Sequence, residues 1–505
     1  MSNVRIARQH VVADEGTRFA HPMRQRRFEA RHRDGASSGI TQPIAVAALA
    51  TMCFLAYSIV SVSNYERFAT RSYDLGIFEQ TVRRYAHLQA PIVHIKGAHL
   101  NVLGDHFSPL LAVLAPLYRL FPTALTLEIA QAALFALSVI PVTRLAVRHT
   151  SAARGLAIGA AYGLAWGLQQ AVDVDFHEIC LAVPLLAFSL CALVDRRWLA
   201  CALWASPLVL VKEDLGLTVA VIGVCVMTRG QRRTGGTLAA CGVVASAITI
   251  LVVMPAIDST GRYPYWNELL PGGRSHTPLA LARSLFDPAT KLVTLVMIFG
   301  ITGFLALRSS ICLAVLPTLA WRFLAETPSY WGTDWHYNAV LMPIVFVALV
   351  DATIATRAST RPWLRAYGVN VASATLAAAI ALSGQFPLSR LIDPATYHGG
   401  QRVAEAREAL AQITSGSVVE TDVGLMAHLT SRCDVYFITR AGNPPPDFLV
   451  IASAWSPSVT DAAAYAERLH PGVRYQLVYS SSSYQVAHRS PQLATTADPI
   501  ERSAP

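Results

Sequence analysis

The stretch ITQPIAVAALATMCFLAYSIVSV, residues 40–62, decides the class of fold. It carries no charged residue. As a helix rising about 1.5 Å per residue it is about 35 Å long, enough to cross a hydrocarbon core of about 30 Å. The run is too long for the apolar part of a cleavable signal peptide, so we predict that it stays in the protein as a signal anchor.

Apolar runs of this kind recur along the chain. The 505 residues are 53% hydrophobic and only 14% charged, whereas a soluble protein carries about 25% charged residues. We therefore predict a polytopic α-helical membrane protein with about eleven transmembrane helices. A shorter run at 109–121 is expected in the interface, and the short spans near 198–228 allow tilted, re-entrant or merged segments. The expected spans are 40–62, 123–146, 153–172, 178–194, 198–211, 214–228, 236–256, 289–307, 310–325, 337–355 and 363–383.

Arginine clusters beside these runs predict the orientation. Residues 1–39 hold eight arginines and cannot bury a core, so we predict a disordered, basic, cytoplasmic tail. The rule that basic loops stay inside gives the same side to every other arginine-bearing loop. An odd number of spans then puts the C-terminal region outside. Because the net charge of +9 is distributed in this way, it favours a topology signal over nucleic-acid binding. The clusters are Arg144, Arg148 and Arg154; Arg196 and Arg197; Arg229, Arg232 and Arg233; Arg308; and Arg357, Arg361 and Arg365.

The membrane domain, 40–383, is expected to carry one large outer loop, 63–108. After Ser72 this loop has apolar residues at helical spacing, which predicts an amphipathic helix suited to the membrane surface. The stripe consists of Leu75, Phe78, Val82, Tyr85 and Leu88.

The region after the last span changes to alternating strand and helix patterns. Such alternation predicts a small sheet with packed helices, here an extracytoplasmic α/β domain over 384–490 followed by a loose tail, 491–505. Strands are expected near 417–421, 435–438, 447–452, 475–479 and 484–489, with helices near 401–413 and 460–469.

Alternation of the spans places six polar clusters on the outer face. Asp74 is the leading catalytic candidate, because it follows the first span at the start of the amphipathic helix. The alternative is a structural one, since an acid in a first turn complements the helix dipole. Glu79 lies away from the apolar stripe and is interpreted as solvated or supporting.

The run Asp173-Val174-Asp175-Phe176-His177-Glu178 is the densest titratable cluster. Its oxygens and imidazole suit a divalent cation, although a polar turn that caps two helices explains it equally well. We favour a polar turn over a metal site and expect a functional role for at least one of the acids, with Asp173, Asp175, His177 and Glu178 as candidates for binding the acceptor or an ion. No other cofactor is predicted.

Charged and aromatic residues of the other outer turns complete the candidate set. Lys212 is a point charge suited to a phosphate, or it pairs with its acidic neighbours. The histidines can donate hydrogen bonds or carry protons, and the aromatic residues either form an interface belt or stack on sugars. The remaining candidates are His106 and His336, and, as supporting residues, Asp105, Glu213, Asp214, Tyr263, Tyr265, Trp266 and Tyr337.

Several function classes lack their signatures. No P-loop, G-x-S-x-G elbow, H-E-x-x-H helix or haem-binding pattern is present. Seven of the eight cysteines lie in or beside apolar runs and Cys433 stands apart, so neither a disulfide framework nor a thiolate metal site is implied.

Six motifs taken together resemble domain-of-unknown-function family 2079 (DUF2079), bacterial multi-pass membrane proteins. The resemblance covers about 40–380 and the outer domain, and it implies the bacterial cell membrane as location. The family pattern has Asp-Phe-His-Pro-Glu where this chain has Asp-Phe-His-Glu. The motifs are YDLGIFEQ (73–80), DHFSPLL (105–111), DFHE (175–178), VKEDLGL (211–217), YPYW (263–266) and HY (336–337).

That family is similar in layout to the GT-C glycosyltransferases, membrane enzymes that take a sugar from a polyprenyl-phosphate carrier. The resemblance implies a lipid-linked sugar donor, an extracytoplasmic glycan, lipid or protein acceptor, and inverting transfer with Asp74 as general base. Lys212, His106 and His336 would then face the donor phosphate. Two alternatives stay open at this point: a polyprenyl-lipid transporter or flippase, and a non-catalytic envelope assembly protein.

Overall fold

The computed structural model describes residues 23–69, 73–266, 285–440 and 442–491. Contacts divide the chain into two compact units, Met1–Ala45 and Val46–Pro505. Helix α1 (Met23–Glu66) begins within the segment expected to be a disordered tail, so part of that tail is helical. The rest of it, 1–22, lies outside the described residues, as does the C-terminal tail from residue 492.

Helices long and apolar enough to cross a membrane confirm the membrane class. Five such helices are found among the described residues. Six further apolar helices are shorter, so the number of eleven spans stays a prediction. The five are Gln42–Glu66, Ala124–His149, Arg232–Ile257, His336–Arg357 and Pro362–Ser383; the shorter ones are Pro109–Leu120, Glu178–Val194, Trp198–Leu210, Leu215–Thr228, Ala289–Gly300 and Ser310–Leu324.

The span expected at 153–172 is broken in the structure. It forms α5 (Ala152–Gly163) and α6 (Trp166–Asp173), which are separated by an extended residue at Ala165. The break leaves carbonyl groups without helical partners, and side chains satisfy them: the Tyr57 hydroxyl donates to the Gly163 carbonyl at 2.5 Å, and the Gln169 amide donates to that of Leu164 at 2.7 Å.

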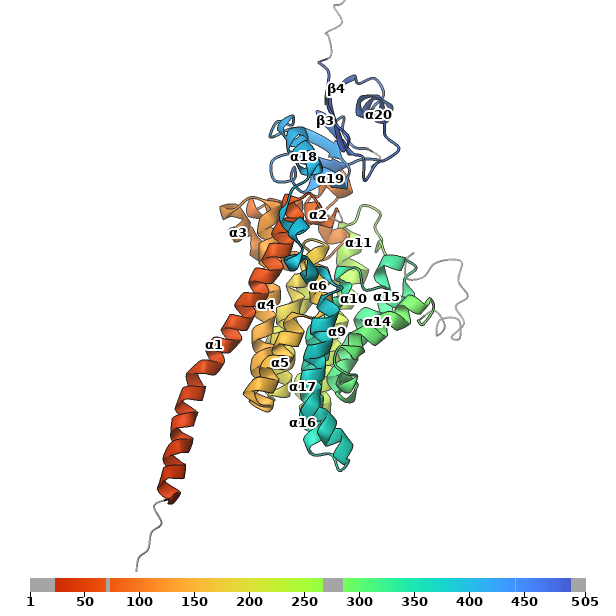
Figure 1. Ribbon diagram of the computed structural model, residues 1–505. Helices are drawn as coiled ribbons and strands as arrows, with labels where there is room; N and C mark the ends of the chain where they lie inside the picture. The colour runs from red at the N-terminus through yellow and green to blue at the C-terminus, as the bar shows by residue number, and fades with distance from the viewer. Residues whose placement is uncertain (1–22, 70–72, 267–284, 441, 492–505) are drawn as a thin grey trace, which may run out of the picture. The chain divides into compact units, whose positions relative to one another are not determined.

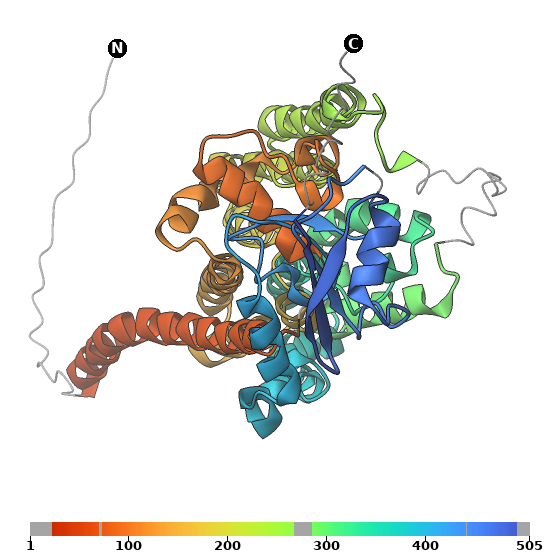
Figure 2. The same cartoon turned by 90° about the horizontal axis from the view of Figure 1, so that it is seen from above.

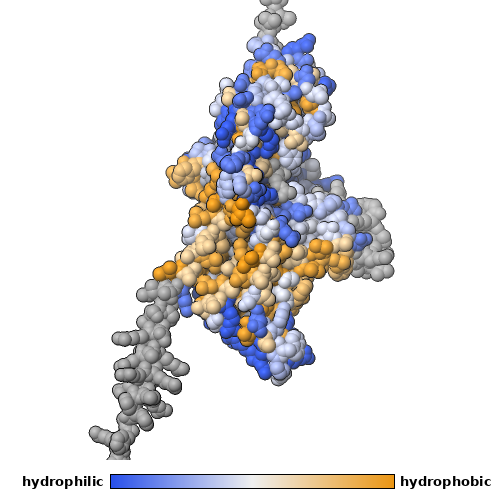
Figure 3. All heavy atoms as spheres, viewed as in Figure 1, coloured by the Kyte–Doolittle hydropathy of each residue, from blue (hydrophilic) through white to orange (hydrophobic). Residues whose placement is uncertain are grey.

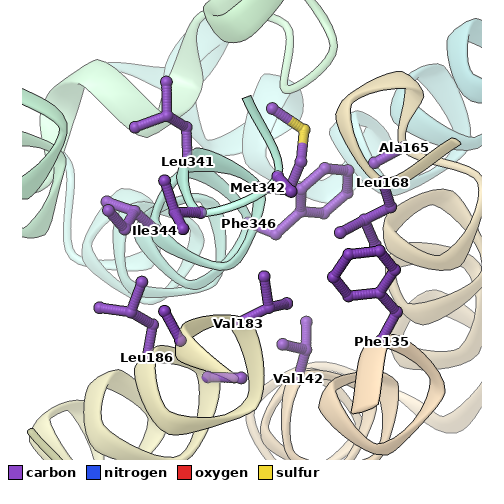
Figure 4. Packing of buried hydrophobic residues seen from close by; sticks show 14 of the residues in the cluster. Phe135, Val142, Ala165, Leu168, Val183, Leu186, Leu341, Met342, Ile344 and Phe346 are labelled. Atoms are coloured by element: carbon purple, nitrogen blue, oxygen red, sulfur yellow. The ribbon is translucent and has the colours of Figure 1, made fainter. Parts of the chain in front are cut away.

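The core of the bundle gathers around α16 (Leu341–Arg357), which is buried along most of its length. A helix that is apolar all round is stable only when neighbours cover every face. Figure 4 shows Phe346 of α16 and residues of α4 (Ala124–His149) and α7 (Ala182–Val194) in one apolar cluster. The labelled residues of α4 and α7 are Phe135, Val142, Val183 and Leu186.

Helices α9 (Leu215–Thr228) and α10 (Arg232–Ile248) approach closely through glycines. A Cβ on Gly216 would lie 2.5 Å from the Gly242 carbonyl oxygen, so neither position has room for a side chain. Small residues at such crossings let backbones pack in a membrane. Further helices among the described residues are α3 (Ala115–Leu120), α8 (Trp198–Ala205), α11 (Met254–Ile257), α14 (Ala289–Gly300), α15 (Leu316–Leu324) and α17 (Pro362–Ser383).

Arginine-bearing ends of the helices meet one another. Arg148, in the last turn of α4, pairs with Asp195, which follows α7, at 2.5 Å. Arg229, which follows α9, pairs with Asp351 of α16 at 2.8 Å. The ends of α4 and α7 thus meet, as do those of α9 and α16, and the Arg357 guanidinium at the end of α16 donates to the His149 carbonyl at the end of α4. The beginnings of α7, α9 and α16 lie at the other end of the bundle. Figure 3 shows hydrophobic residues gathered over the middle of the helical part, with hydrophilic residues beyond them on both sides.

The C-terminal region contains a five-stranded sheet of order β2-β1-β3-β5-β4. Strands β2, β1 and β3 are parallel to one another, with Val419 of β1 opposite Val435 of β2 and Phe448 of β3. The β3–β5 and β5–β4 pairs are antiparallel. Helices α18 and α19 cover one face and α20 the other. The elements are α18 (Gln401–Ala411), β1 (Val418–Thr421), α19 (Val423–Met426), β2 (Asp434–Phe437), β3 (Phe448–Ala452), α20 (Ala462–Leu469), β4 (Tyr475–Ser480) and β5 (Tyr484–Arg489).

The amphipathic helix α2 (Asp74–Ala86) lies between the bundle and the sheet domain. Leu75, Phe78 and Val82 pack in the bundle core, as their spacing predicts. The opposite face is covered as well: Ile77 packs with the sheet domain and Gln80 donates to the Val435 carbonyl at 2.9 Å. The C-terminal domain therefore covers the face of α2 opposite the bundle, and the position of this helix along the membrane surface stays a prediction.

Candidate functional site

Several candidate residues, far apart in sequence, are joined by contacts at the bundle end that faces α2. Asp74 begins α2, His177 lies between α6 and α7, Lys212 precedes α9, and His336 precedes α16. The loop carrying Asp105 and His106 adjoins them through electrostatic interactions with Asp74 and Lys212.

The centre of the cluster is an ion pair between Asp74 and His177. The His177 Nε2 atom lies 3.1 Å from Asp74 Oδ2. The imidazole is 3% exposed and the carboxylate 32% exposed. A solute can therefore reach the acid from one side while the base behind it is sealed in protein.

The hydrogen bonds of His177 require both ring nitrogens to carry protons. Nε2 faces a carboxylate, and Nδ1 lies 3.1 Å from the carbonyl oxygen of Asp175, which only accepts. Burial lowers the pKa of His177, but the hydrogen bond and charge of Asp74 raise it above its usual value. Burial likewise raises the pKa of Asp74, and the bond and charge of His177, with the charge of His106, outweigh burial and lower this pKa to about 2.

His336 stacks on His177 with ring centroids 3.5 Å apart. Its side chain is 4% exposed, and its Nδ1 atom has no hydrogen-bond partner among the described residues. A buried ring nitrogen in this state is set to bond a group that enters the site. Tyr337 lies against the same ring at a centroid distance of 4.0 Å.

Lys212 and Glu178 form a second buried ion pair, with Nζ and Oε1 3.1 Å apart. The lysine also lies over the Trp321 ring, whose indole N–H donates to Asp214 at 2.9 Å. Glu213 accepts from the Phe107 amide at 3.3 Å. Both acidic neighbours thus have other contacts, and Lys212 pairs with the chain neighbour of His177.

The Asp105–His106 loop is held by the aromatic YPYW segment. The Tyr265 hydroxyl lies 2.9 Å from His106 Nε2 and 3.3 Å from Asp105 Oδ1, and Lys96 pairs with Asp105. Close approach of this loop to α11 requires glycine at position 104, because a Cβ there would lie 2.8 Å from the Asp258 amide nitrogen.

The two other aromatic residues of this segment, Tyr263 and Trp266, lie on either side of Tyr265 in the chain. Tyr263 is buried and packs edge-on against Tyr265 and Trp266, with ring centroids 5.6 and 5.4 Å apart. Trp266 is exposed. These rings form a small aromatic wall beside His106, which is a suitable surface for a sugar ring or a headgroup.

The residues of the 173–178 turn face different partners. Asp173 pairs with Arg390 and accepts from Asn64 at 3.1 Å, so it ties α6 to the segment after α17. Asp175 is buried with a left-handed φ of 69°, a conformation that aspartate tolerates better than most residues. In the part of the chain that the structure describes, no group of three or more His, Cys, Asp or Glu side chains is arranged to hold a metal ion. The divalent cation stays a prediction.

Two residues of α4 that the sequence analysis missed orient the turn. Glu128 accepts from the Phe176 amide at 2.8 Å, and Gln131 accepts from the His177 amide and donates to the Asp175 carbonyl, both at 3.1 Å. Both side chains are buried. The available signal was an acid inside an apolar span, where ionisable residues are rare and functional.

Arg322 of α15 is a third residue that the sequence analysis missed and that orients a loop of the site. Its guanidinium is fully buried and donates to the Tyr330 carbonyl at 2.7 Å and to the Asn338 side chain at 2.9 Å. These bonds fix both ends of the loop that carries His336. Arg322 also lies over the Tyr337 ring at 5.5 Å and adds positive charge near the site.

Glu79 does not belong to this cluster. It is 0% exposed and accepts from the hydroxyls of Tyr118, at 2.9 Å, and Thr430. Of the two interpretations of Glu79, the solvated one is wrong, because the side chain joins α2, α3 and the sheet domain; the supporting role stays a prediction. Burial raises its pKa to about 7 despite these two hydrogen bonds.

The fold and this cluster define a multi-pass membrane protein whose fold is similar to that of solved structures. The crystal structure of ArnT from Cupriavidus metallidurans bound to undecaprenyl phosphate matches with a TM-score of 0.52 at 15% identity, over 90% of this chain and 99% of that chain. Its apo state matches with a TM-score of 0.48 at 16% identity, over 90% and 98%. The oligosaccharyltransferase of Archaeoglobus fulgidus, in complex with Zn and sulfate, matches with a TM-score of 0.42 at 12% identity, over 88% and 73%.

The sequence assigns the chain to a particular family. The DUF2079 family, described as predicted membrane proteins, matches residues 64–487, so the chain belongs to this family. No curated protein sequence matches the chain.

Proposed function

We propose that the protein is an inverting glycosyltransferase that moves a sugar from a polyprenyl-phosphate donor to an acceptor on the outer side of the bacterial cell membrane. The observation that carries the proposal is the partly exposed Asp74 carboxylate, which lies against the buried, positively charged imidazole of His177. An acid at this position, His177 behind it and Lys212 beyond Glu178 form a site with separate places for a proton acceptor and an anion. The ArnT fold match supports a polyprenyl phosphate as carrier, since that protein binds undecaprenyl phosphate.

In the proposed reaction Asp74 removes the proton from the acceptor hydroxyl. The oxygen forms a bond to the anomeric carbon while the bond from that carbon to the phosphate oxygen breaks, with inversion. Polyprenyl phosphate leaves with the electron pair of the broken bond, and the proton stays on the carboxyl until solvent removes it. The ion pair with His177 holds the carboxylate in one orientation.

The departing phosphate gains negative charge, which favours fixed positive groups beside it. Lys212 is the leading candidate, and the unpartnered Nδ1 of His336 supplies a further hydrogen bond when it carries the proton. His106, which contacts Tyr265, is a further candidate for binding the donor phosphate. We propose that the aromatic wall at Tyr263 and Trp266 contacts the sugar or the acceptor, and that the C-terminal domain, packed on α2, helps to bind the acceptor.

The proposal is tested by incubating purified protein in liposomes with a radiolabelled polyprenyl-phosphate sugar and a cell-envelope extract as acceptor. We expect labelled product and free polyprenyl phosphate from the wild type. Asp74→Asn should lose about 10²–10⁴-fold in rate, the usual contribution of a general base. The matched control is Asp258→Asn, an aspartate whose carboxylate caps its own turn at the Thr260 amide. Lipid translocation without a new glycosidic bond, or equal transfer rates for both variants, would refute the proposed glycosyltransferase activity.

A further inference from the structure

A groove outside the Asp74 site runs along the C-terminal half of α1. Its other wall is formed by residues 396–407, which lead into α18 and form its first turns. The volume is about 600 Å³, within the usual range for a ligand site of about 300–1,000 Å³. Figure 2 shows α18 beside the end of α1, and the Arg407 guanidinium lies 3.4 Å from the Glu66 carboxylate.

The groove changes from apolar to charged along its length. Leu55, Ile59 and Val62 follow one another at helical spacing on the α1 wall, within a helix long and apolar enough to cross a membrane. Arg67 and Arg407 line the end beyond them. An apolar channel that finishes in cations at the end of a membrane span has the chemistry of a lipid chain below its headgroup.

Polar atoms in the lining lack partners. Ser58 Oγ, Arg67 Nε and Thr396 Oγ1 are buried and have no hydrogen-bond partner among the described residues. Thr396 is only 3% exposed, so its hydroxyl has no access to bulk water. Leaving such buried donors unbonded destabilises the folded protein. Arg67 Nε and Thr396 Oγ1 lie at the charged end and can both donate to the oxygens of one phosphate group, whereas Ser58 lies about 13 Å earlier along α1, beside the apolar part of the groove.

The charge of the groove selects among lipids. Two arginines and Glu66 give a net charge of +1 at the polar end. A phosphodiester carries one negative charge, which a zwitterionic headgroup cancels with its own cation. We propose that the groove binds one anionic membrane phospholipid, with an acyl chain along Leu55 and Ile59 and the phosphate beside Arg67 and Thr396. The bound lipid would join the first membrane span to the sheet domain.

The test is native mass spectrometry of the full-length protein released from nanodiscs that contain equal amounts of phosphatidylglycerol and phosphatidylcholine. We expect one retained phosphatidylglycerol per wild-type protein. Ala404→Trp, which places an indole in the groove from an exposed helical position, should reduce retention at least tenfold. Ala411→Trp makes the same change at an exposed position of α18 outside the groove and should retain the lipid.

A charge variant tests the headgroup. Arg407→Gln should reduce the preference for phosphatidylglycerol over phosphatidylcholine about fivefold, the effect of one basic residue near an anionic surface. Arg474→Gln removes another exposed arginine of the sheet domain that pairs with a glutamate, and it should leave the preference unchanged. Equal retention of both phospholipids, or equal loss in both tryptophan variants, would overturn the proposal. Displacement of the retained phospholipid by added undecaprenyl phosphate would also overturn it, because the groove would then belong to the sugar carrier.

Discussion

Replacing Glu79 by glutamine should change how the stability of the protein depends on pH. The carboxyl group is fully buried between α2, α3 and the sheet domain, and burial raises its pKa from 4.5 to about 7. In the unfolded chain it ionises near 4.5, so folding takes up a proton between these two pH values. The free energy of unfolding of the wild type therefore falls as the pH rises from about 4.5 to about 7, and the contribution of this group is constant above pH 7.

The magnitude follows from the shift of about 2.5 pKa units. At about 1.36 kcal/mol per unit, the ionised carboxylate costs the folded state about 3 kcal/mol above pH 7. Glutamine never ionises, and its amide can accept from Tyr118 and donate to the Thr430 hydroxyl. Glu79→Gln should therefore gain about 3 kcal/mol relative to the wild type between pH 4.5 and pH 7, with no further gain above.

Unfolding midpoints of detergent-purified protein, followed by tryptophan fluorescence from pH 4 to pH 9, measure this difference. Glu408→Gln is the matched control, because Glu408 is an exposed acid that accepts from Tyr479 on the sheet domain. Its curve should run parallel to that of the wild type. Parallel curves for Glu79→Gln as well would mean that the carboxyl does not titrate in this window, and the account of its burial would be wrong.

Three further variants test the site and its frame. His177→Gln removes the cation that lowers the pKa of Asp74, so the acidic limb of the transfer rate should move to higher pH; an unmoved limb in the rate profile would refute the coupling. Lys212→Met should raise the KM for the lipid-linked donor about tenfold or more in steady-state kinetics, the effect of losing one hydrogen bond to a charged group. Arg390→Gln removes one ion pair of Asp173 and should lower stability in thermal unfolding by less than the about 3–5 kcal/mol of a fully buried pair, because Arg390 is 35% exposed, while the double variant with Asp173→Asn should recover most of the loss.

Features that depend on neighbouring residues in the chain were predictable. The membrane class follows from uninterrupted apolar runs, and the strand and helix pattern after the last span matches β1 to β5, α18 and α20 closely. Period and composition act within a segment, so no knowledge of distant contacts is needed. The helix that begins at Asp74 was predictable for the same reason, since its stripe at Leu75, Phe78 and Val82 faces the core.

Tertiary structure decided which partner each polar residue has. Spacing alone grouped the acids and the histidine of residues 173–178, yet Asp173 faces Arg390, His177 faces Asp74, and Glu178 faces Lys212. The burial of Glu79 depends on a sheet domain encoded more than 300 residues later. The sequence by itself determined the apolar spans and the sheet pattern, because the energies that set them are local. Only the folded chain decided which charges meet, because burial and ion pairing depend on residues that are distant in sequence and close in space.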